Sequence, residues 1–410
     1  ELTSLYELVP KLDDGSHYGS NAQLVQFGFD PESKSALLTG PLYTHNHSPT
    51  IVWCPNGDML ISWFSGESEV GPELTLLASR GKRQSDGTLK WTYPSEFLKA
   101  ADRNMHSSNI IISSSKATQS GVLHQMASIG TTGRWDKMAM GYRKSTDNGA
   151  TWSPVRMILE LDHGHTKGMT MQGNMFETQK GDLVFVADDE GDSVSTTGSL
   201  VVSSDGGESW HRRGHSFSTP GEKRIAGLHA AVAEIADQND DGNPDLLAIG
   251  RDKGEYYDGM APISLSIDGG STWSRKASIF PSIKGEQRFG LLRLQYAATD
   301  SKPLLFVGFA NEEFEAKNSE ADPDKVKGLF VALSWDEGKT WPEEHRRVIS
   351  NINGANSKQI GVAPWQKINT LSKNQGQEIG YMSIIQSPDG LIYLTDGKMV
   401  YTFNLSWILE

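Results

Sequence analysis

The stretch Ser-Ser-Asp-Gly-Gly-Glu-Ser-Trp at residues 203–210 follows a pattern that occurs four times in this chain. Each copy has Ser, then Asp two positions later, Gly after two more, and finally Thr or Ser followed by Trp. The Asp can accept hydrogen bonds from the backbone amides of a tight turn, the Gly can take a positive φ, and the Trp can cover the apolar layer beneath. The pattern predicts four similar turns, at residues 145–152, 203–210, 266–273 and 334–341.

The spacing of these turns indicates the architecture. Asp147, Asp205, Asp268 and Asp336 are 58, 63 and 68 positions apart, which is about the length of one four-stranded propeller blade. Short β-rich segments that meet at turns run in phase with the pattern and mark six inner hairpins. We expect an all-β fold, a β-propeller with four-stranded antiparallel blades, as a single domain over residues 1–410. Two β-sandwiches would not explain turns at blade spacing.

Ring closure is expected to involve the N-terminal part of the chain. The last segment offers only three strands before the C-terminus, and residues 21–29 can supply the fourth. Six blades are visible in the sequence, and a seventh could be assembled from residues 1–44 or 342–376.

Composition narrows the classes of function. Lys and Arg number 38 against 51 Asp and Glu, a net charge of -13, which argues against nucleic acid as a partner. No run of about eighteen apolar residues exists, so we expect no membrane-spanning helix. The chain has no glycine-rich phosphate loop beside a helix and no His/Cys cluster with zinc spacing, so we expect no organic cofactor. A monomer is expected.

The residues just before the inner strands are candidates for a site. In a propeller the first strand of each blade lies nearest the axis, so the residues that precede these strands surround one mouth of the ring. Three histidines, an arginine, a tyrosine and an amide at equivalent positions favour a chemical site over a packed plug. These blade-start residues are His47, His106, Gln172, His229, Arg288 and Tyr381, with His165, Arg251 and Tyr257 as further candidates nearby.

A second motif predicts a metal site. Residues 237–245 place oxygen donors at positions 1, 3, 5 and 9, namely Asp237, Asn239, Asp241 and Asp245, with Gly242 at the bend. Such spacing suits a hard cation, especially calcium in a structural role. An EF-hand would need Glu at position 12, where this chain has Ala248. The alternative is an acidic, solvated turn. Calcium would also indicate an extracellular setting, and we expect a secreted protein.

The four turns resemble the Asp-box, or BNR, repeats of the sialidase superfamily, and the resemblance covers most of the chain. It implies the propeller fold. Sialidases of this superfamily use three arginines on the substrate carboxylate, a Tyr nucleophile assisted by Glu, and an Asp as acid/base. Arg251 and Arg288 match the second and third arginine, whereas the start of the first blade, residues 43–49, contains no arginine.

Parts of the chain also resemble sialidase-like bacterial and fungal proteins, and related propellers include ulvan lyases and L-rhamnose-α-1,4-D-glucuronate lyases. The similar stretches are residues 47–66, 102–108, 225–235, 258–273 and 401–408. Those lyases act on rhamnose–uronate linkages with histidine and tyrosine at the propeller mouth. The histidine-rich set of blade-start residues fits them better than it fits a sialidase.

The chemistry of β-elimination suits these residue types. Removing the C5 proton of a glucuronate requires donors that neutralise its carboxylate, a base of moderate pKa, and an acid for the departing oxygen. A hydrolase normally uses a carboxylate pair, and none of the six blade-start residues is Asp or Glu. We therefore expect a polysaccharide lyase that cleaves a rhamnose–glucuronate linkage. The net charge favours exo-attack on a terminal, rhamnose-capped glucuronate over endo-attack on a long polyanion.

Blade position and resemblance together suggest roles. His106 is the first choice for proton transfer, with His47 as its partner, and Tyr381 or Tyr257 would protonate the leaving group. Arg251 and Arg288, helped by Gln172, would hold the carboxylate, with His229 and His165 as further substrate-binding residues. Two alternatives remain open: an exo-glycoside hydrolase, either a sialidase or a rhamnosidase, and a non-catalytic glycan-binding propeller.

Overall fold

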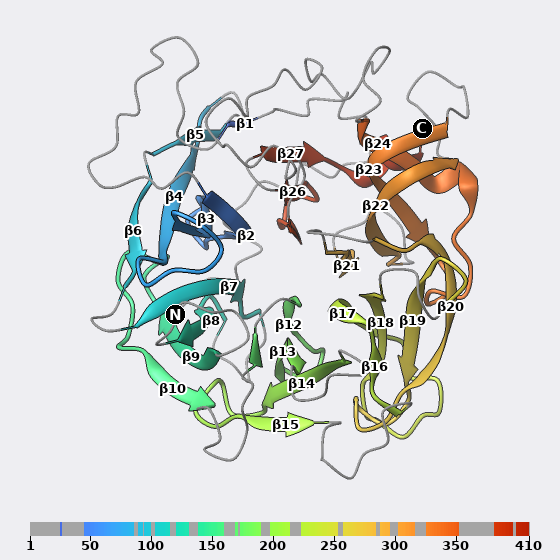
Figure 1. Cartoon of the computed structure of the whole chain (residues 1–410), viewed down its shortest axis with the longest axis horizontal. Coiled ribbons are helices and arrows are strands. Elements are labelled where there is room, and N and C mark those ends of the chain that lie inside the picture. The colour runs from blue at the N-terminus through green and yellow to red at the C-terminus, as the bar shows by residue number, and fades with distance from the viewer. Residues whose placement is uncertain are drawn as a thin grey trace.

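The fold is a ring of six antiparallel sheets around a central axis (Figure 1). It is seen in a computed structural model that describes residues 25–26, 45–85, 89–92, 94–99, 103–114, 120–130, 138–159, 169–170, 173–189, 197–213, 223–252, 257–283, 288–295, 302–315, 325–351, 381–396 and 399–409. The predicted all-β propeller is confirmed, and the described residues form six blades. In the part of the chain described, the one α-helix is α1 (Leu405–Leu409). None of the described helices has the length and apolar character needed to cross a membrane.

The first three blades follow one another along the chain, each beginning with its strand nearest the axis. Blade 1 contains β2 (His45–Trp53), β3 (Met59–Gly66), β4 (Thr75–Arg83) and β5 (Leu89–Trp91), with β6 (Ser95–Leu98) also pairing with β4. Blade 2 contains β7 (Asn104–Ile112), β8 (Leu123–Gly130), β9 (Met138–Ser145) and β10 (Arg156–Leu159). In blade 3, β11 (Met169–Thr170) and β12 (Met175–Glu177) pair with β13 (Leu183–Asp189), followed by β14 (Thr197–Ser203), β15 (His211–Arg213) and β16 (Ile225–Ala226).

The remaining three blades complete the ring. Blade 4 contains β17 (Leu228–Ile235), β18 (Asp245–Arg251), β19 (Met260–Ser266) and β20 (Ser274–Pro281). Blade 5 contains β21 (Gly290–Arg293), β22 (Leu304–Glu315), β23 (Lys325–Ser334) and β24 (Arg346–Asn351), with the 3-10 turn η3 (Glu343–His345) before β24. Blade 6 contains β25 (Met382–Gln386), β26 (Ile392–Asp396), β27 (Met399–Phe403) and β1 (Val25–Gln26).

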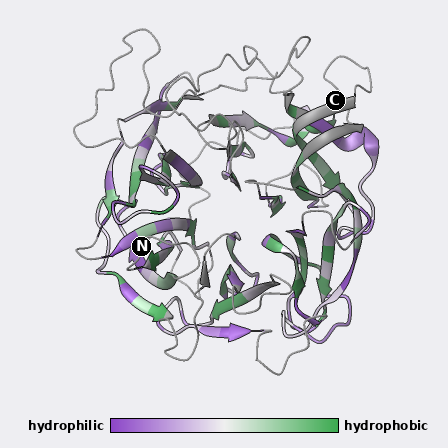
Figure 2. Ribbon diagram, viewed as in Figure 1, coloured by the Kyte–Doolittle hydropathy of each residue, from purple (hydrophilic) through white to green (hydrophobic). Residues whose placement is uncertain are grey.

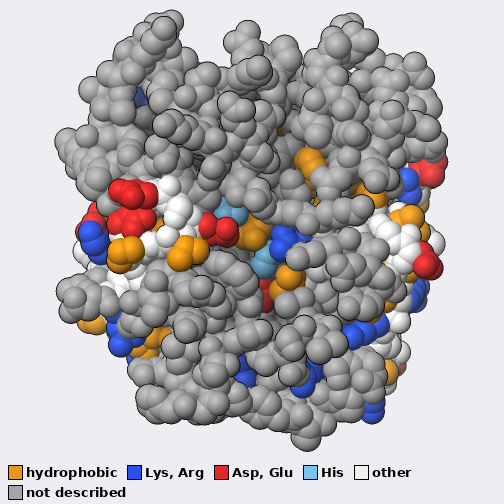
Figure 3. All heavy atoms as spheres, viewed as in Figure 1, with side chains coloured by type: hydrophobic (Ala, Val, Ile, Leu, Met, Phe, Trp, Pro, Cys, Tyr) orange, Lys and Arg blue, Asp and Glu red, His pale blue; other side chains and the backbone are white. Residues whose placement is uncertain are grey.

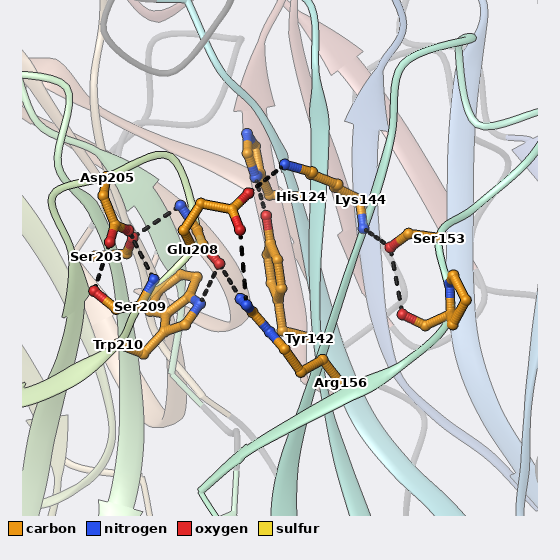
Figure 4. Close-up of polar contacts among 12 residues, drawn as sticks. His124, Tyr142, Lys144, Ser153, Arg156, Ser203, Asp205, Glu208, Ser209 and Trp210 are labelled. Carbon is orange, nitrogen blue, oxygen red and sulfur yellow. Dashed lines mark hydrogen bonds and ion pairs between the residues drawn. The ribbon is translucent and has the colours of Figure 1, made fainter.

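The repeated turns join the third and fourth strands of blades 2 to 5, and they have the hydrogen bonds that the pattern predicts. In blade 3, Asp205 Oδ1 accepts a hydrogen bond from the backbone N–H of Ser209 at 2.8 Å. Asp205 Oδ2 accepts a second one from the Ser209 hydroxyl at 2.5 Å (Figure 4). Ser203 Oγ accepts the N–H of Gly207 at 2.8 Å, and Trp210 Nε1 donates to the carbonyl of Gly207 at 3.1 Å. All of these bonds lie within eight residues, so each turn can form on its own.

The glycine in each turn also has a tertiary role. Gly207 has a φ of +90°, and a Cβ built on it would lie 2.1 Å from the hydroxyl oxygen of Tyr142 in blade 2. Gly338 of blade 5 has a φ of +79°, and a Cβ there would lie 2.3 Å from Leu247 of blade 4. The turn therefore requires glycine for two reasons, its backbone conformation and the close packing of the preceding blade.

Apolar side chains fill the spaces between neighbouring blades. Between blades 4 and 5, Phe280 stacks on Phe306 with 4.0 Å between ring centroids, and Trp341 meets Phe280 edge-on at 5.4 Å. In Figure 2, β18 within blade 4 is mostly hydrophobic, whereas β15, at the outer edge of blade 3, is hydrophilic. Burial between blades is the main source of stability in such a ring, since no blade can cover its own two faces.

Blades 6 and 1 meet where the ring closes. Val25 and Gln26 of β1 pair antiparallel with Val400 and Met399 of β27, so an N-terminal segment contributes the fourth strand of blade 6. Arg83 of blade 1 forms an ion pair with the buried carboxylate of Asp389. The pairing of β1 with β27 lies within blade 6, and the ion pair joins blade 6 to blade 1.

Candidate active site

The inner strands carry several of the candidate residues to the ring axis. His47 of β2, His229 of β17, Arg288 just before β21 and Tyr381 just before β25 come from blades 1, 4, 5 and 6. The ring centroids of His47 and Tyr381 are 4.3 Å apart, and the Arg288 Cζ atom lies 5.8 Å from the centroid of the Tyr381 ring. Together with Asp188, described next, these residues form what we call the axial cluster.

A chain of hydrogen bonds runs through the axial cluster. The hydroxyl of Tyr381 lies 2.9 Å from Nε2 of His229, and Nδ1 of the same imidazole bonds to Oδ2 of Asp188. Asp188 lies on β13 of blade 3 and is fully buried. Because the carboxylate is an acceptor, Nδ1 carries the imidazole proton, and Nε2 is left to accept the Tyr381 hydroxyl proton.

His229 has an unusual backbone conformation. Its φ of +51° lies in the left-handed region, which costs an ordinary residue about 1–2 kcal/mol. The backbone N–H of His229 donates to Oδ1 of Asp188 at 2.7 Å, so one carboxylate holds both the main chain and the ring of this residue. Such local strain is typical of functional positions.

Burial determines the protonation states in the cluster. It raises the pKa of Tyr381 to about 12, and the charges of Glu69 and Asp188 act in the same direction against those of nearby arginines. Burial lowers the pKa of His229, although the Asp188 carboxylate opposes this shift. At neutral pH the cluster therefore holds a protonated phenol beside a neutral imidazole.

Two arginines give the cluster positive charge. Arg288 is 3% exposed, and it donates from Nε to the carbonyl of Met382 at 2.6 Å and from Nη2 to that of Pro49 at 3.2 Å. Burial lowers the pKa of Arg288 to about 10, which leaves the guanidinium charged at neutral pH. Arg251 ends β18, and its charge acts on both His229 and Tyr381.

The other predicted site residues are placed differently. His106 is fully buried on β7, where its ring stacks on Phe64 at 4.2 Å, and Phe64 in turn meets His47 edge-on at 5.6 Å. Tyr257 lies half-buried in the turn between β18 and β19, and no hydrogen bond or ring contact joins it to the described members of the axial cluster. His165 and Gln172 lie outside the described residues.

Sequence reasoning did not select three residues that contribute to this region: Asp188, Phe64 and Glu69. Asp188 follows the buried strand segment 183–187, at the strand end that faces the same mouth as the blade-start residues. An acidic residue at the end of a second strand of a blade, which reaches the same mouth, is therefore the sequence signal that could have identified Asp188. Phe64 is apolar within an apolar strand and gives no such signal.

The site lies on the face shown in Figure 3. Histidine, acidic and basic side chains are visible together near the centre of this face, where the ring axis runs. Side chains of three chemical kinds therefore gather at one end of the axis.

The predicted metal-binding loop lies at the other end of blade 4. It joins β17 to β18 at residues 236–244, whereas His229 and Arg251 occupy the opposite ends of the same two strands. Whatever the loop binds is therefore remote from the axial cluster.

Comparison with known proteins agrees with the fold. The BNR repeat-like domain family matches residues 57–394 of this propeller, so the chain belongs to that family. This confirms the predicted resemblance to BNR, sialidase-like propellers. No protein with a curated description matches the sequence.

Several solved structures share the fold at low sequence identity. The Hadza microbial sialidase Hz136 is 15% identical with a TM-score of 0.62, over 94% of this chain and 68% of that one. The intramolecular trans-sialidase of Ruminococcus gnavus is 11% identical with a TM-score of 0.62, over 89% and 96%. A Dyadobacter fermentans protein of unknown function is 15% identical with a TM-score of 0.58, over 88% and 96%. Identities this low show a common fold.

Proposed function

We propose that this protein is a secreted carbohydrate-active enzyme, a lyase that cleaves a rhamnose–glucuronate linkage by β-elimination. The observation that carries the proposal is the hydrogen-bonded chain from Tyr381 through His229 to Asp188, with the Arg288 guanidinium beside it. It combines an acid, a base held in one tautomer, and a positive charge for a carboxylate.

The proton transfers follow from the protonation states. The substrate carboxylate faces the guanidinium groups of Arg251 and Arg288, which stabilise the charge that develops as the C5 proton leaves. As the substrate binds, the Tyr381 hydroxyl turns from Nε2 of His229 to the oxygen on C4, which frees the Nε2 lone pair. The neutral imidazole then takes the C5 proton at Nε2, and Asp188 stabilises the imidazolium that forms. The electrons of the C5–H bond form the C4=C5 double bond as the C4–O bond breaks. Tyr381 donates its proton to the departing oxygen.

The resting state is then restored within the cluster. After elimination Tyr381 is a phenolate and His229 an imidazolium, and the proton returns across the 2.9 Å hydrogen bond between them. In a D-glucuronate the C5 hydrogen and the C4 oxygen lie on the same face of the ring. One acid and one base that are direct neighbours can therefore serve both ends of the reaction.

The geometry favours His229 over His106 as the base. His106 stacks on Phe64 and its Nδ1 lies 3.0 Å from the hydroxyl of Ser107, whereas His229 bonds directly to Tyr381. The ring of His47 is tilted by 44° against the ring of Tyr381, with 4.3 Å between the centroids. Mutagenesis of His229 and of His106 therefore distinguishes the two candidate bases.

The test is a reaction with a rhamnose-capped glucuronate glycan such as gum arabic. Ultraviolet absorbance of the conjugated uronate and release of rhamnose are followed together in the wild type, His229→Asn, Tyr381→Phe and His106→Asn. We expect both signals in the wild type and a fall of about 10²–10⁴-fold in the first two variants. His211→Asn, at an exposed position of β15, is the matched control.

A hydrolase of the sialidase type is the second candidate. It is favoured by a tyrosine that has two arginines around it and the charge of Glu69 acting on it. Free sugar without the absorbance of an unsaturated uronate would show hydrolysis and overturn the lyase. Binding of the glycan without either signal would instead indicate the non-catalytic alternative.

A further inference from the structure

The acidic loop of blade 4 has a compact internal structure. Asp237 accepts the backbone N–H of Gly242 at 2.8 Å and that of Asn239 at 3.1 Å, and Asp241 accepts the N–H of Asn243 at 2.6 Å. Gly242 makes the bend with a φ of +74°. Each accepting oxygen keeps a second lone pair, so these bonds do not prevent the same carboxylates from binding a cation.

Asp245 adds an observation that hydrogen bonding within the loop does not explain. Its side chain is fully buried at the start of β18, and its Oδ2 accepts the backbone N–H of Gln238, inside the loop, at 2.7 Å. Its Oδ1 is buried without a hydrogen-bond partner among the described residues. A buried carboxylate oxygen without a partner is costly, and the usual remedy is a cation or a further donor.

We propose that this loop binds one calcium ion through oxygen atoms of Asp237, Asn239, Asp241 and Asp245. Within the described residues, no three or more His, Cys, Asp or Glu side chains are already arranged around a metal position. The ligands therefore close on the ion as it binds, and the bond from Asn239 Nδ2 to Asp241 Oδ2, 3.2 Å long, is released. Calcium tolerates such irregular oxygen ligands, whereas magnesium requires a near-ideal octahedron.

The ion acts on stability rather than on the reaction. Ile235 pairs with Asp245 at the loop end of the β17–β18 hairpin, and Leu228 pairs with Arg251 at the axial end. At about 3.3 Å per residue the two ends are about 20 Å apart. Calcium would stabilise the β17–β18 hairpin at its loop end without contacting the axial cluster.

Thermal unfolding tests the proposal in protein that has been freed of divalent ions with EDTA. At a calcium concentration about 100-fold above Kd, the Tm of the wild type is expected to rise by about 3 °C. Asp245→Asn removes a ligand and is expected to abolish the rise. Asp240→Asn is the matched control, because Asp240 is an exposed carboxylate in the same loop outside the ligand set. Calorimetric titration with calcium gives the stoichiometry.

The outcomes separate cleanly. A rise in wild type and Asp240→Asn, with none in Asp245→Asn and none with magnesium in the wild type, supports the site. An equal rise in Asp245→Asn, an equal response to magnesium, or no rise in the wild type overturns it. Asp237→Asn, in the half-buried first position, repeats the comparison if the buried substitution prevents folding.

Discussion

The hydroxyl of Tyr381 and Nε2 of His229 are 2.9 Å apart, although 152 positions separate the two residues in the chain. The hydrogen bond joins blade 6 to blade 4 near the ring axis. It holds a phenol with a raised pKa next to an imidazole with a lowered pKa, which keeps the acid protonated and the base neutral. The proposed elimination requires this pairing of protonation states.

Asp188→Asn tests whether the carboxylate positions His229. The amide can still accept the backbone N–H of His229, but it cannot accept from Nδ1 as a carboxylate does, so the tautomer is no longer held. We expect kcat to fall by about 10²–10⁴-fold with little change in KM. Steady-state kinetics on any substrate that shows turnover provide the measurement. Asp182→Asn, at the other end of the same strand, is the control, and full activity in Asp188→Asn would refute the role.

In the proposed mechanism, the fall of kcat/KM at low pH depends on the protonation of His229. Its pKa is lowered by burial, so the imidazole stays neutral down to below the ordinary 6.5 of histidine and loses its function as a base only at lower pH. Because Tyr381 titrates at about 12, the acid stays protonated throughout the neutral range. We expect kcat/KM to be level near neutral pH and to fall below pH 6.5. A half-maximal point above 6.5 would contradict His229 as the base.

Gly207→Ala tests the packing of the blade 3 turn against Tyr142 of blade 2, the residue drawn beside this turn in Figure 4. The new Cβ would meet the Tyr142 hydroxyl at 2.1 Å and would force alanine to adopt a φ of +90°. Gly57→Ala is the matched control, because Gly57 has a φ of +87° and nothing within 4 Å of the added atom. We expect the control to lose about 1–2 kcal/mol of unfolding free energy, and Gly207→Ala to lose about 1–3 kcal/mol more. Denaturant unfolding measures both, and equal losses would show that the packing contact is unimportant.

His124 makes stability depend on pH. It is fully buried on β8, its Nδ1 lies 2.7 Å from the Tyr142 hydroxyl, and burial lowers its pKa to about 4 from 6.5. The unfolded chain takes up this proton below 6.5 while the folded protein does not, so stability is lost as pH falls from 6.5 towards 4. The loss is about 3 kcal/mol over that window.

His124→Asn measures this contribution. The amide can keep a hydrogen bond to Tyr142 but does not titrate, so its stability should change less between pH 6.5 and pH 4. His211→Asn, at an exposed site, should keep the wild-type dependence. Identical slopes in His124→Asn and the wild type would count against the assignment.

The amino-acid sequence alone determined the turns, the blades and their number to within one. The Asp-box bonds join residues within eight positions, so they repeat visibly along the chain, and four copies at blade spacing leave little choice of architecture. The sequence also showed which residues stand at the starts of the inner strands. It could not rank them, because all six are expected at the same mouth.

Only the tertiary structure decided which side chains meet. Asp188 is 41 positions from His229, and Phe64 contacts both His47 and His106 from a strand that reads as ordinary core. Such contacts depend on how blades pack against one another around the ring. Contacts between blades do not recur at a fixed spacing in the sequence. The partners of Tyr381 could therefore not be predicted from a sequence pattern.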